Sequence, residues 1–206
     1  MSNVNIPGES NNAPTSTDDT TRGRNHRVRR HLIEWVILLI VVGVVTVGLR
    51  TYVFQTYFIP SGSMEPTLQI GDRILVDKLA VDWGTVKRGD IIVFKSPANE
   101  DCGGVHDPIL VKRVIGLPGD SLYSLGNTIY VNGKKLDEAW PHTEPLGPPA
   151  IASRAHPVVV AANHYFMVGD NHSDSCDSRY WGTITHSAII GKAFFRIWPL
   201  SRVGFP

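Results

Sequence analysis

Two serines lie two positions apart in a short segment that is stiffened by prolines. Ser61 and Ser63 stand between Pro60 and Pro66, and one glycine separates them. Such a loop can hold a hydroxyl at a fixed geometry, as nucleophilic catalysis requires. The surrounding residues do not match the G-x-S-x-G pattern of a nucleophile elbow. A simple Pro/Gly/Ser linker would have the same composition, so the segment alone leaves both interpretations open.

A serine nucleophile needs a base, and the sequence offers two kinds. His172 lies near Asp170 and Asp174, but a histidine in a Gly-Asp-Asn turn is typical of a protein surface. A lysine is the alternative, and the candidates are Lys78, Lys87, Lys95 and Lys112. Lys112 differs from the others because it interrupts the apolar stretch 109–115, where burial would lower its pKa.

The pKa decides whether Lys112 could act as a base. A lysine with the usual pKa of ~10.4 is neutral in about 4 of 10,000 copies at pH ~7, so a base needs a pKa lower by ~2–3 units. Apolar neighbours can supply this change by removing water from the amine, and the polar loop 169–182 could hydrogen-bond to it. That loop lacks the spacing of an EF-hand calcium site. In a strand, Lys112 and Arg113 point to opposite faces, and the alternation does not show which of them faces inward.

The composition excludes several classes of protein. The chain has 206 residues, 42% of them hydrophobic, which suits one ordinary domain with attachments and not a large (β/α) barrel. Its formal net charge is +1, so no overall basic field points to nucleic acid. The two cysteines and eight scattered histidines lack the spacing of a structural zinc site or an HExxH motif.

The first 50 residues divide into a polar tail and an apolar span. Residues 1–31 contain almost no large apolar side chains and are predicted to form a disordered tail with a basic end. Residues 32–50 are predicted to form a transmembrane helix, because ~20 mostly apolar residues cross the hydrocarbon core. The arginines before the span place the amino end in the cytoplasm and the rest of the chain outside.

A cleavable signal is the competing interpretation of the same span. Large aromatic residues follow it, however, where a signal would have a small-x-small cleavage site. The aromatic residues that resemble interfacial anchors are Trp35, Tyr52, Phe54 and Tyr57. An uncleaved anchor is therefore favoured.

The remainder, residues 51–206, is predicted to be mainly β. Six short segments are β-branched or aromatic and mostly bounded by turn residues: 72–78, 90–94, 109–115, 128–131, 165–168 and 188–198. Asn132 and Gly133 predict a tight hairpin. Five prolines within residues 140–157 predict an extended surface excursion outside the core.

Six motifs occur in a fixed order behind the predicted anchor. They are Pro60-Ser-Gly-Ser-Met-x-Pro-Thr-Leu68, Gly71-Asp-x-Ile-Leu-Val76, Arg88-Gly-Asp-Ile-Ile-Val-Phe94, Val111-Lys-Arg-Val-Ile-Gly-Leu-Pro-Gly-Asp120, Met167-Val-Gly-Asp-Asn171 and Asp177-Ser-Arg-Tyr-Trp-Gly182. Each motif alone is a modest signal, whereas the ordered set resembles the type I signal peptidases over about residues 32–200. The resemblance implies an antiparallel β-rich catalytic core with a variable insertion, here residues 121–163.

The resemblance also implies a serine/lysine dyad in place of a triad. Ser63 matches the nucleophile of the family, and Lys112 matches its general base. The backbone N–H of Ser63 and the hydroxyl of Ser61 match the oxyanion hole. Since Arg113 follows the base in the family too, we expect Lys112 to face inward and Arg113 to face away.

Three further positions match residues that support the lysine. Ser175 matches a serine that hydrogen-bonds the amine and holds it on the nucleophile. Asp177 and Arg179 match an ion pair that supports this wall of the site.

The family removes N-terminal signal peptides from exported preproteins by cutting after small residues, in the Ala-x-Ala pattern. The positions that match the walls of its substrate pocket are Ile59, Pro60, Met64, Leu68, Ile74, Leu110 and Val111. A shallow apolar pocket would accept alanine and exclude larger side chains, and the substrate would lie extended along an exposed strand edge. The resemblance implies no metal and no cofactor.

The resemblance agrees with the expected topology. It implies a single-pass protein of the plasma (inner) membrane with its catalytic domain outside. The expected partners are exported preproteins and the lipid bilayer, with the export translocon as a further candidate and no nucleic acid.

Two positions leave questions open. His172 stands where the family commonly has an arginine, and this change could alter the local pH sensitivity. Cys176 lies beside Ser175, and outside the membrane it could form a disulfide with Cys102. The sequence does not show the distance between the two cysteines, so the bridged and the free forms both stay open.

Three other functions share some of these features. A serine/lysine peptidase with one dedicated substrate would carry the same residues. A catalytically inactive relative could bind extended peptides or scaffold the export machinery, but it would need no base beside a nucleophile. A self-cleaving repressor would share the dyad but would need a DNA-binding domain, which the amino-terminal tail does not supply.

Overall fold

The chain divides into two compact units, Met1–Val47 and Gly48–Pro206. The computed structural model describes residues 19–82, 86–100 and 107–206, apart from the side chains of residues 19–28, 49–52 and 82. Cys102 lies outside the described residues, and its pairing with Cys176 stays one of the two alternatives that the sequence leaves open.

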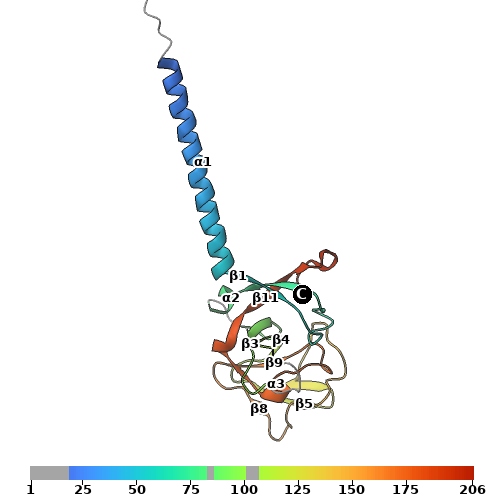
Figure 1. Cartoon of the computed structure of the whole chain (residues 1–206). Helices are drawn as coiled ribbons and strands as arrows, with labels where there is room; N and C mark the ends of the chain where they lie inside the picture. The colour runs from blue at the N-terminus through green and yellow to red at the C-terminus, as the bar shows by residue number, and fades with distance from the viewer. Residues whose placement is uncertain (1–18, 83–85, 101–106) are drawn as a thin grey trace, which may run out of the picture. The chain divides into compact units, whose positions relative to one another are not determined.

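The helix α1 (Asp19–Tyr52) contains the apolar span (Figure 1). Its segment Arg29–Gly48 has a mean hydropathy of 2.3, and it is long and apolar enough to cross a membrane. The helix begins at Asp19 and not at Leu32, so residues 19–31, expected within a disordered tail, are helical. An i,i+4 ion pair between Arg30 and Glu34, 3.1 Å long, supports the helix across the expected boundary. Residues 1–18 of the predicted tail lie outside the described residues.

The second unit is β-rich and antiparallel, which confirms the predicted fold class. In its described part, seven strands form one sheet in the order β1-β2-β11-β3-β4-β9-β10. These strands are β1 (Phe54–Phe58), β2 (Arg73–Asp77), β3 (Ile91–Lys95), β4 (Ile109–Gly116), β9 (His164–Val168), β10 (Ile184–Thr185) and β11 (Ile189–Trp198). Every neighbouring pair is antiparallel, and β4 lies inside the sheet between β3 and β9.

A smaller sheet is formed entirely within the residues expected as the insertion. Its described strands lie in the order β7-β6-β5-β8 and are β5 (Ser121–Leu125), β6 (Thr128–Val131), β7 (Lys134–Lys135) and β8 (Val158–Val159). The hairpin between β6 and β7 turns at Asn132 and Gly133, whose φ angles are 51° and 77°. This left-handed backbone is the one that an Asn-Gly hairpin turn requires, so the predicted hairpin is confirmed.

Short helical turns connect the strands. They are α2 (Leu79–Asp82), α3 (Ser178–Trp181) and the 3-10 turns η1 (His186–Ala188) and η2 (Leu200–Arg202). The sequence does not predict the strand β1, because its aromatic residues resemble interfacial anchors. Tyr57 instead packs against buried residues beside β2, and the ring of Phe54 lies 5.6 Å from that of Phe194.

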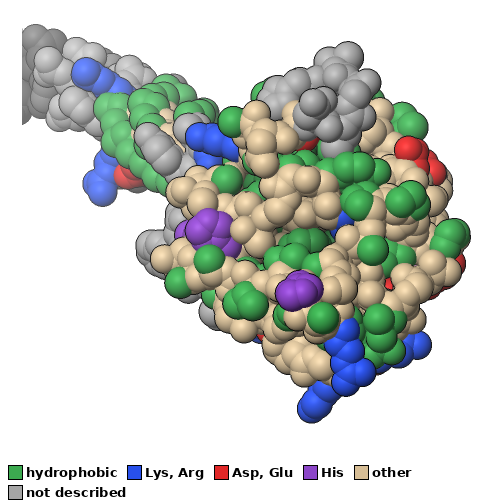
Figure 2. Space-filling view, turned by 90° about the horizontal axis from the view of Figure 1, so that it is seen from below, with side chains coloured by type: hydrophobic (Ala, Val, Ile, Leu, Met, Phe, Trp, Pro, Cys, Tyr) green, Lys and Arg blue, Asp and Glu red, His purple; other side chains and the backbone are tan. Residues whose placement is uncertain are grey.

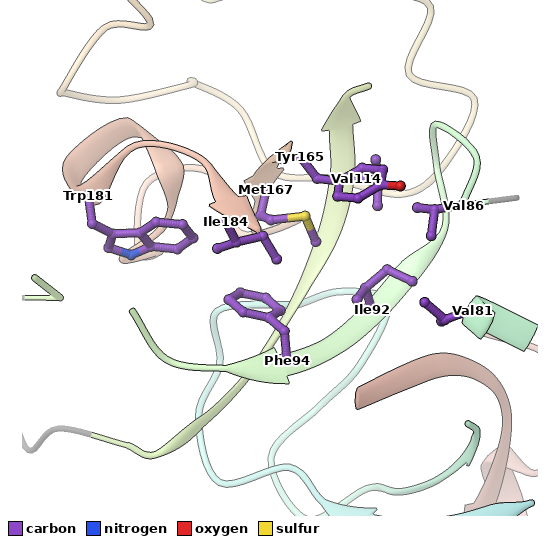
Figure 3. Packing of buried hydrophobic residues seen from close by; sticks show 9 residues of the cluster. All are labelled: Val81, Val86, Ile92, Phe94, Val114, Tyr165, Met167, Trp181 and Ile184. Carbon is purple, nitrogen blue, oxygen red and sulfur yellow. The ribbon is translucent and has the colours of Figure 1, made fainter. Parts of the chain in front are cut away.

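Three hydrophobic clusters cover the sheets. In the first cluster, side chains from β3, β4, β9 and α3 point toward one another, with Phe94, Met167 and Trp181 among them (Figure 3). The second cluster joins β4 and β9 to the smaller sheet. The third lies between the serine segment and β2, β3 and β11.

The strand β4 is covered on both faces. Lys112 is 3% exposed and Arg113 is 5% exposed, so both cations are buried. The expectation that Arg113 faces away from the core is therefore wrong. The physical reason is that Trp140 of the insertion covers this face of β4, and Arg113 pairs there with Asp170.

The proline-rich stretch 140–157 differs from its prediction at two positions. Leu146 and Ile151 are each 1% exposed and belong to the second cluster. The other residues of the stretch are exposed or half-buried. The stretch therefore runs over the surface, as predicted, and two of its side chains anchor it in the core.

The smaller sheet offers a matched test of this packing. Leu122 is fully buried in β5, whereas Leu125 in the same strand is 47% exposed. We expect Leu122→Ala to lower the free energy of unfolding by about 2–5 kcal/mol, because it leaves a cavity in the second cluster. Leu125→Ala should change it by less than about 0.5 kcal/mol. Denaturant unfolding of both variants in detergent measures the difference, and equal losses would contradict the assigned burial.

Candidate active site

Ser63 lies in a turn that buried apolar residues hold against the core. The buried residues of this turn are Ile59, Met64 and Leu68. The backbone N–H of Ile59 donates to the carbonyl of Asp72, and its carbonyl accepts from the N–H of Gly71, both at 2.9 Å. Ser63 stays half-buried and Ser61 is exposed. The buried side chains thus fix the turn against the core, and the hydroxyls of Ser61 and Ser63 stay accessible.

A cavity joins this turn to the beginning of β4. Ser61, Ser63 and Lys112 all line it, so two hydroxyls and an amine share one space. The Oγ atoms of Ser61 and Ser63 lie 3.5 Å apart. The structure therefore brings together the predicted nucleophile, base and oxyanion hydroxyl.

Most of the cavity wall is apolar. Five of the seven positions predicted for the substrate pocket line it: Ile59, Pro60, Met64, Leu110 and Val111. The other two, Leu68 and Ile74, are fully buried in the third cluster and do not line it. Five wall residues were not predicted: Tyr57, Phe58, Asp107, Pro108 and Ile109. The aromatic run 52–58 could have indicated the first two had it been tested as a strand.

Lys112 is held in an apolar environment. Its neighbours on the same face of β4, Leu110 and Val114, pack in the first cluster. Burial lowers the pKa of Lys112 to about 8, and the carboxylate of Asp177 acts in the opposite direction. Among the described residues, the amine makes no hydrogen bond. A large share of the Lys112 amines is therefore neutral at mildly alkaline pH, as a general base requires.

The hydroxyl of Ser175 is buried close to the Ser63 backbone. A Cβ placed on Gly169 would lie 2.3 Å from both the Oγ of Ser175 and the carbonyl oxygen of Ser63. Only a residue without a side chain fits between these atoms. Within the described part of the chain, the Oγ of Ser175 has no hydrogen-bond partner. The bond to the Lys112 amine that the resemblance implied is not formed in this structure.

Asp177 and Arg179 form a buried ion pair behind Ser175. The Nη2 of Arg179 lies 2.8 Å from the Oδ2 of Asp177, and both side chains are fully buried. The same Nη2 donates to the carbonyl of Ser175 at 3.2 Å. The Oδ2 of Asp177 accepts from the N–H of Gly169 at 3.1 Å. The pair therefore ties both ends of the loop that carries Ser175.

A second buried ion pair lies on the other face of β4. Arg113 donates from Nε and Nη2 to the two carboxylate oxygens of Asp170 at 2.7 and 2.6 Å. The ring of Trp140 lies over the guanidinium, 5.0 Å from its centre. This bidentate geometry fixes Asp170, at the start of the loop that carries Ser175.

Asn171 connects this loop to the serine turn. Its backbone N–H donates to the carbonyl of Ser63, and its Nδ2 donates to the carbonyl of Gly62, both at 3.1 Å. Asn171 and Gly169 both lie in the fifth motif, but the motif predicts no role for either of them. Their place in the motif marks both residues, but the spacing of a sequence does not show which atoms they contact.

The described residues include no group of three or more His, Cys, Asp or Glu side chains that could hold a metal ion. On the face shown in Figure 2, hydrophobic and uncharged groups are interspersed, and the basic side chains in colour do not form a continuous surface.

Comparison with known proteins decides the family. The model of the family described as "Signal peptidase, peptidase S26" matches residues 32–198. The chain is 42% identical over 147 residues to the probable signal peptidase I-2 of Synechocystis sp., a match that covers 71% of this chain and 64% of that protein. It is 34% identical over 187 residues to signal peptidase IB of Staphylococcus aureus, covering 85% of this chain and 94% of that protein. The chain belongs to the S26 signal peptidase family.

One solved member of the signal peptidases is also similar. The crystal structure of a signal peptidase I from Enterococcus faecalis V583 is 29% identical, and the match covers 52% of this chain and 96% of that chain with a TM-score of 0.41. The match to the Synechocystis protein spans less than two thirds of that relative's length.

His172 of this S26 family member is not the surface residue that its turn suggested. It is 1% exposed, and its ring stacks on that of His142 with 5.1 Å between centroids. Burial lowers the pKa of His172 to about 4, so the ring is neutral at physiological pH. It does not line the cavity that holds Ser63. His172 is therefore not the base that serves Ser63 at this site.

The lowered pKa of Lys112 predicts a cost in stability. The shift from 10.5 to about 8 corresponds to about 3 kcal/mol against folding with a charged amine. The cost is fully present below pH 8 and is relieved between pH 8 and 10.5, because the folded state there binds fewer protons than the unfolded state. We expect Lys112→Met to raise the free energy of unfolding by about 3 kcal/mol at pH ~7, and this gain to shrink above pH 8.

Denaturant unfolding across this pH range measures the effect. Lys134→Met, at an exposed lysine of β7, is the matched control and should show no such pH-dependent gain. A gain for Lys112→Met that does not change with pH would contradict the burial of a titrating amine.

Proposed function

We propose that this chain is a membrane-anchored signal peptidase I, a serine endopeptidase that removes signal peptides from exported preproteins. The observation that carries the proposal is the shared cavity of Ser63 and Lys112, in which burial lowers the lysine pKa to about 8. Family membership supplies the reaction class, and the cavity supplies a nucleophile with a base.

The proposed reaction uses the neutral amine of Lys112 first as a base. The proton of the Ser63 hydroxyl passes to Nζ while Oγ attacks the carbonyl carbon of the scissile peptide bond. The ammonium then gives this proton to the leaving amine, and the bond to nitrogen breaks. The mature protein departs with that amine, and the signal peptide stays as an ester on Oγ. Lys112 next takes a proton from water while the water oxygen attacks the acyl carbon. The bond from that carbon to Oγ then breaks, the signal peptide leaves with a new carboxyl group, and the ammonium returns the proton to Oγ.

The negative charge of each tetrahedral intermediate needs donors at its oxygen. The backbone N–H of Ser63 and the hydroxyl of Ser61 are proposed for this role. The 3.5 Å between the Oγ atoms of Ser61 and Ser63 supports it, because it leaves the donor beside the reacting atom. The unpartnered hydroxyl of Ser175 is proposed to hold the amine once the dyad closes on a substrate.

The proposed substrate is an extended peptide with small residues before the cut. The apolar cavity wall, formed by Ile59, Met64, Leu110 and others, supports this choice. Such a wall accepts an alanine methyl group at little cost, whereas a larger side chain would need room that a shallow pocket does not give.

The proposed location follows from the apolar helix. Its segment Arg29–Gly48 anchors the chain once in the plasma membrane, with the amino end inside and residues 51–206 outside. The lipid bilayer and exported preproteins are then its partners, with the translocon as a further candidate. A catalytically inactive peptide binder would gain nothing from a buried lysine, which costs stability.

Cleavage of a preprotein tests the proposal. We expect the full chain in detergent to cut a preprotein once, directly after an Ala-x-Ala sequence. Ser63→Ala and Lys112→Ala should each abolish detectable cleavage, and Ser61→Ala should lower kcat by about 10²–10³-fold, the usual effect of losing one oxyanion donor.

Matched controls separate these roles from general damage. Ser187→Ala and Lys134→Ala change an exposed serine and an exposed lysine and should leave the rate unchanged. Cleavage that survives both Ser63→Ala and Lys112→Ala would show that another nucleophile and base act. No cleavage by the folded native chain would favour a binding function.

A further inference from the structure

The insertion sends a short strap, residues 140–144, back to the loop that holds the serine turn. Two stacking contacts dock this strap: Trp140 lies over the guanidinium of Arg113, and the ring of His142 stacks on that of His172. A hydrogen bond from the hydroxyl of Thr67 to the carbonyl of Pro141, 3.2 Å long, joins it to the end of the serine segment.

Thr143 is the residue of the strap that reaches the loop with its side chain. Its backbone N–H donates to the carbonyl of Asp170 at 2.8 Å. Its Oγ1 accepts from the N–H of His172 at 2.9 Å and donates to the Oδ1 of Asn171 at 3.1 Å. One hydroxyl thus uses its donor and an acceptor position on neighbouring residues of the loop.

This contact orients the side-chain amide of Asn171, together with a longer bond of 3.4 Å that the exposed hydroxyl of Ser173 donates to the same Oδ1. The Oδ1 faces the hydroxyl of Thr143, so the Nδ2 faces the carbonyl of Gly62, to which it donates. The reversed amide would place an oxygen against the Gly62 carbonyl oxygen and lose that bond. The backbone N–H of Asn171 holds the carbonyl of Ser63 in the same way.

We infer that Thr143 is a positioning residue for the nucleophile, acting through Asn171 on the backbone of Gly62 and Ser63. This inference rests on the proposed function, because it takes Ser63 as the nucleophile. The two carbonyls that Asn171 holds set the direction of the turn and so of the Ser63 hydroxyl and N–H. A small rotation there moves both reacting groups away from the scissile bond, at a high cost in rate.

The hydroxyl and the shape of Thr143 can be separated by two substitutions. Thr143→Val keeps the shape but loses the hydroxyl, and we expect kcat to fall by about 10- to 100-fold with KM nearly unchanged. Thr143→Ser keeps the hydroxyl and should retain a rate close to that of the native chain. Thr185→Val, at an exposed threonine of β10, is the matched control and should have no effect.

A double-mutant cycle tests the proposed route. Asn171→Ala should also lower kcat, and the combination of Asn171→Ala with Thr143→Val should lower it no further, because both remove the same connection. Additive losses, a native kcat for Thr143→Val, or an equal loss for Thr143→Ser would each overturn the inference.

A readout without substrate keeps the two proposals apart. The measurement is hydrogen exchange of the backbone N–H of Asn171, followed by NMR. The exchange should be about five- to tenfold faster in Thr143→Val than in the native chain, and it should be close to the native rate in Thr143→Ser. Unchanged exchange overturns the positioning role. If the native chain does not cleave a preprotein, the proposed function is overturned. The exchange result still tests the contact of Thr143 with Asn171, because it needs no substrate.

Discussion

The site depends on keeping the amine of Lys112 away from water. The strand β4 achieves this because it lies inside the larger sheet and is covered on both faces. Burial disfavours the charged amine and lowers its pKa to about 8, although the nearby carboxylate of Asp177 acts against the shift. Arg179 limits that opposing effect, because its guanidinium pairs with the same carboxylate at 2.8 Å. A free carboxylate at this place would keep the lysine protonated and unsuited to act as a base.

The same constraint explains how the loop behind the site is built. The loop 169–179 is held at its start by Arg113 and Asp170 and at its end by Asp177 and Arg179, two ion pairs in the protein interior. Buried pairs contribute little net stability, but removing one partner leaves a costly unpaired charge. Their arrangement fixes the loop in one position. Gly169 then lets this loop approach the serine turn so closely that a side chain would not fit.

Much of the fold could be predicted from the sequence, because short β-branched segments between turn residues leave few alternatives. The environment of the two faces of β4 could not be predicted. Strand alternation distinguishes a buried face from an exposed one only when one face is solvated, and here Lys112 and Arg113 are both buried. The burial of His172 and Leu146 depends on the insertion folding back across the loop, a long-range contact that no local pattern contains. The serine and the lysine were found by residue type and motif order. The contacts of Asn171 that hold the serine turn were not, because they exist only in three dimensions.

The most direct test is the pKa of Lys112 in the folded protein. The full chain, labelled with 13C at the ε-carbon of lysine and held in detergent, would be titrated by NMR, with the Lys112 signal assigned by its absence in Lys112→Met. We expect a midpoint near pH 8 for Lys112, because burial disfavours its charged amine. A midpoint near the usual value of ~10.4 would show that the amine is solvated and would contradict the proposed base.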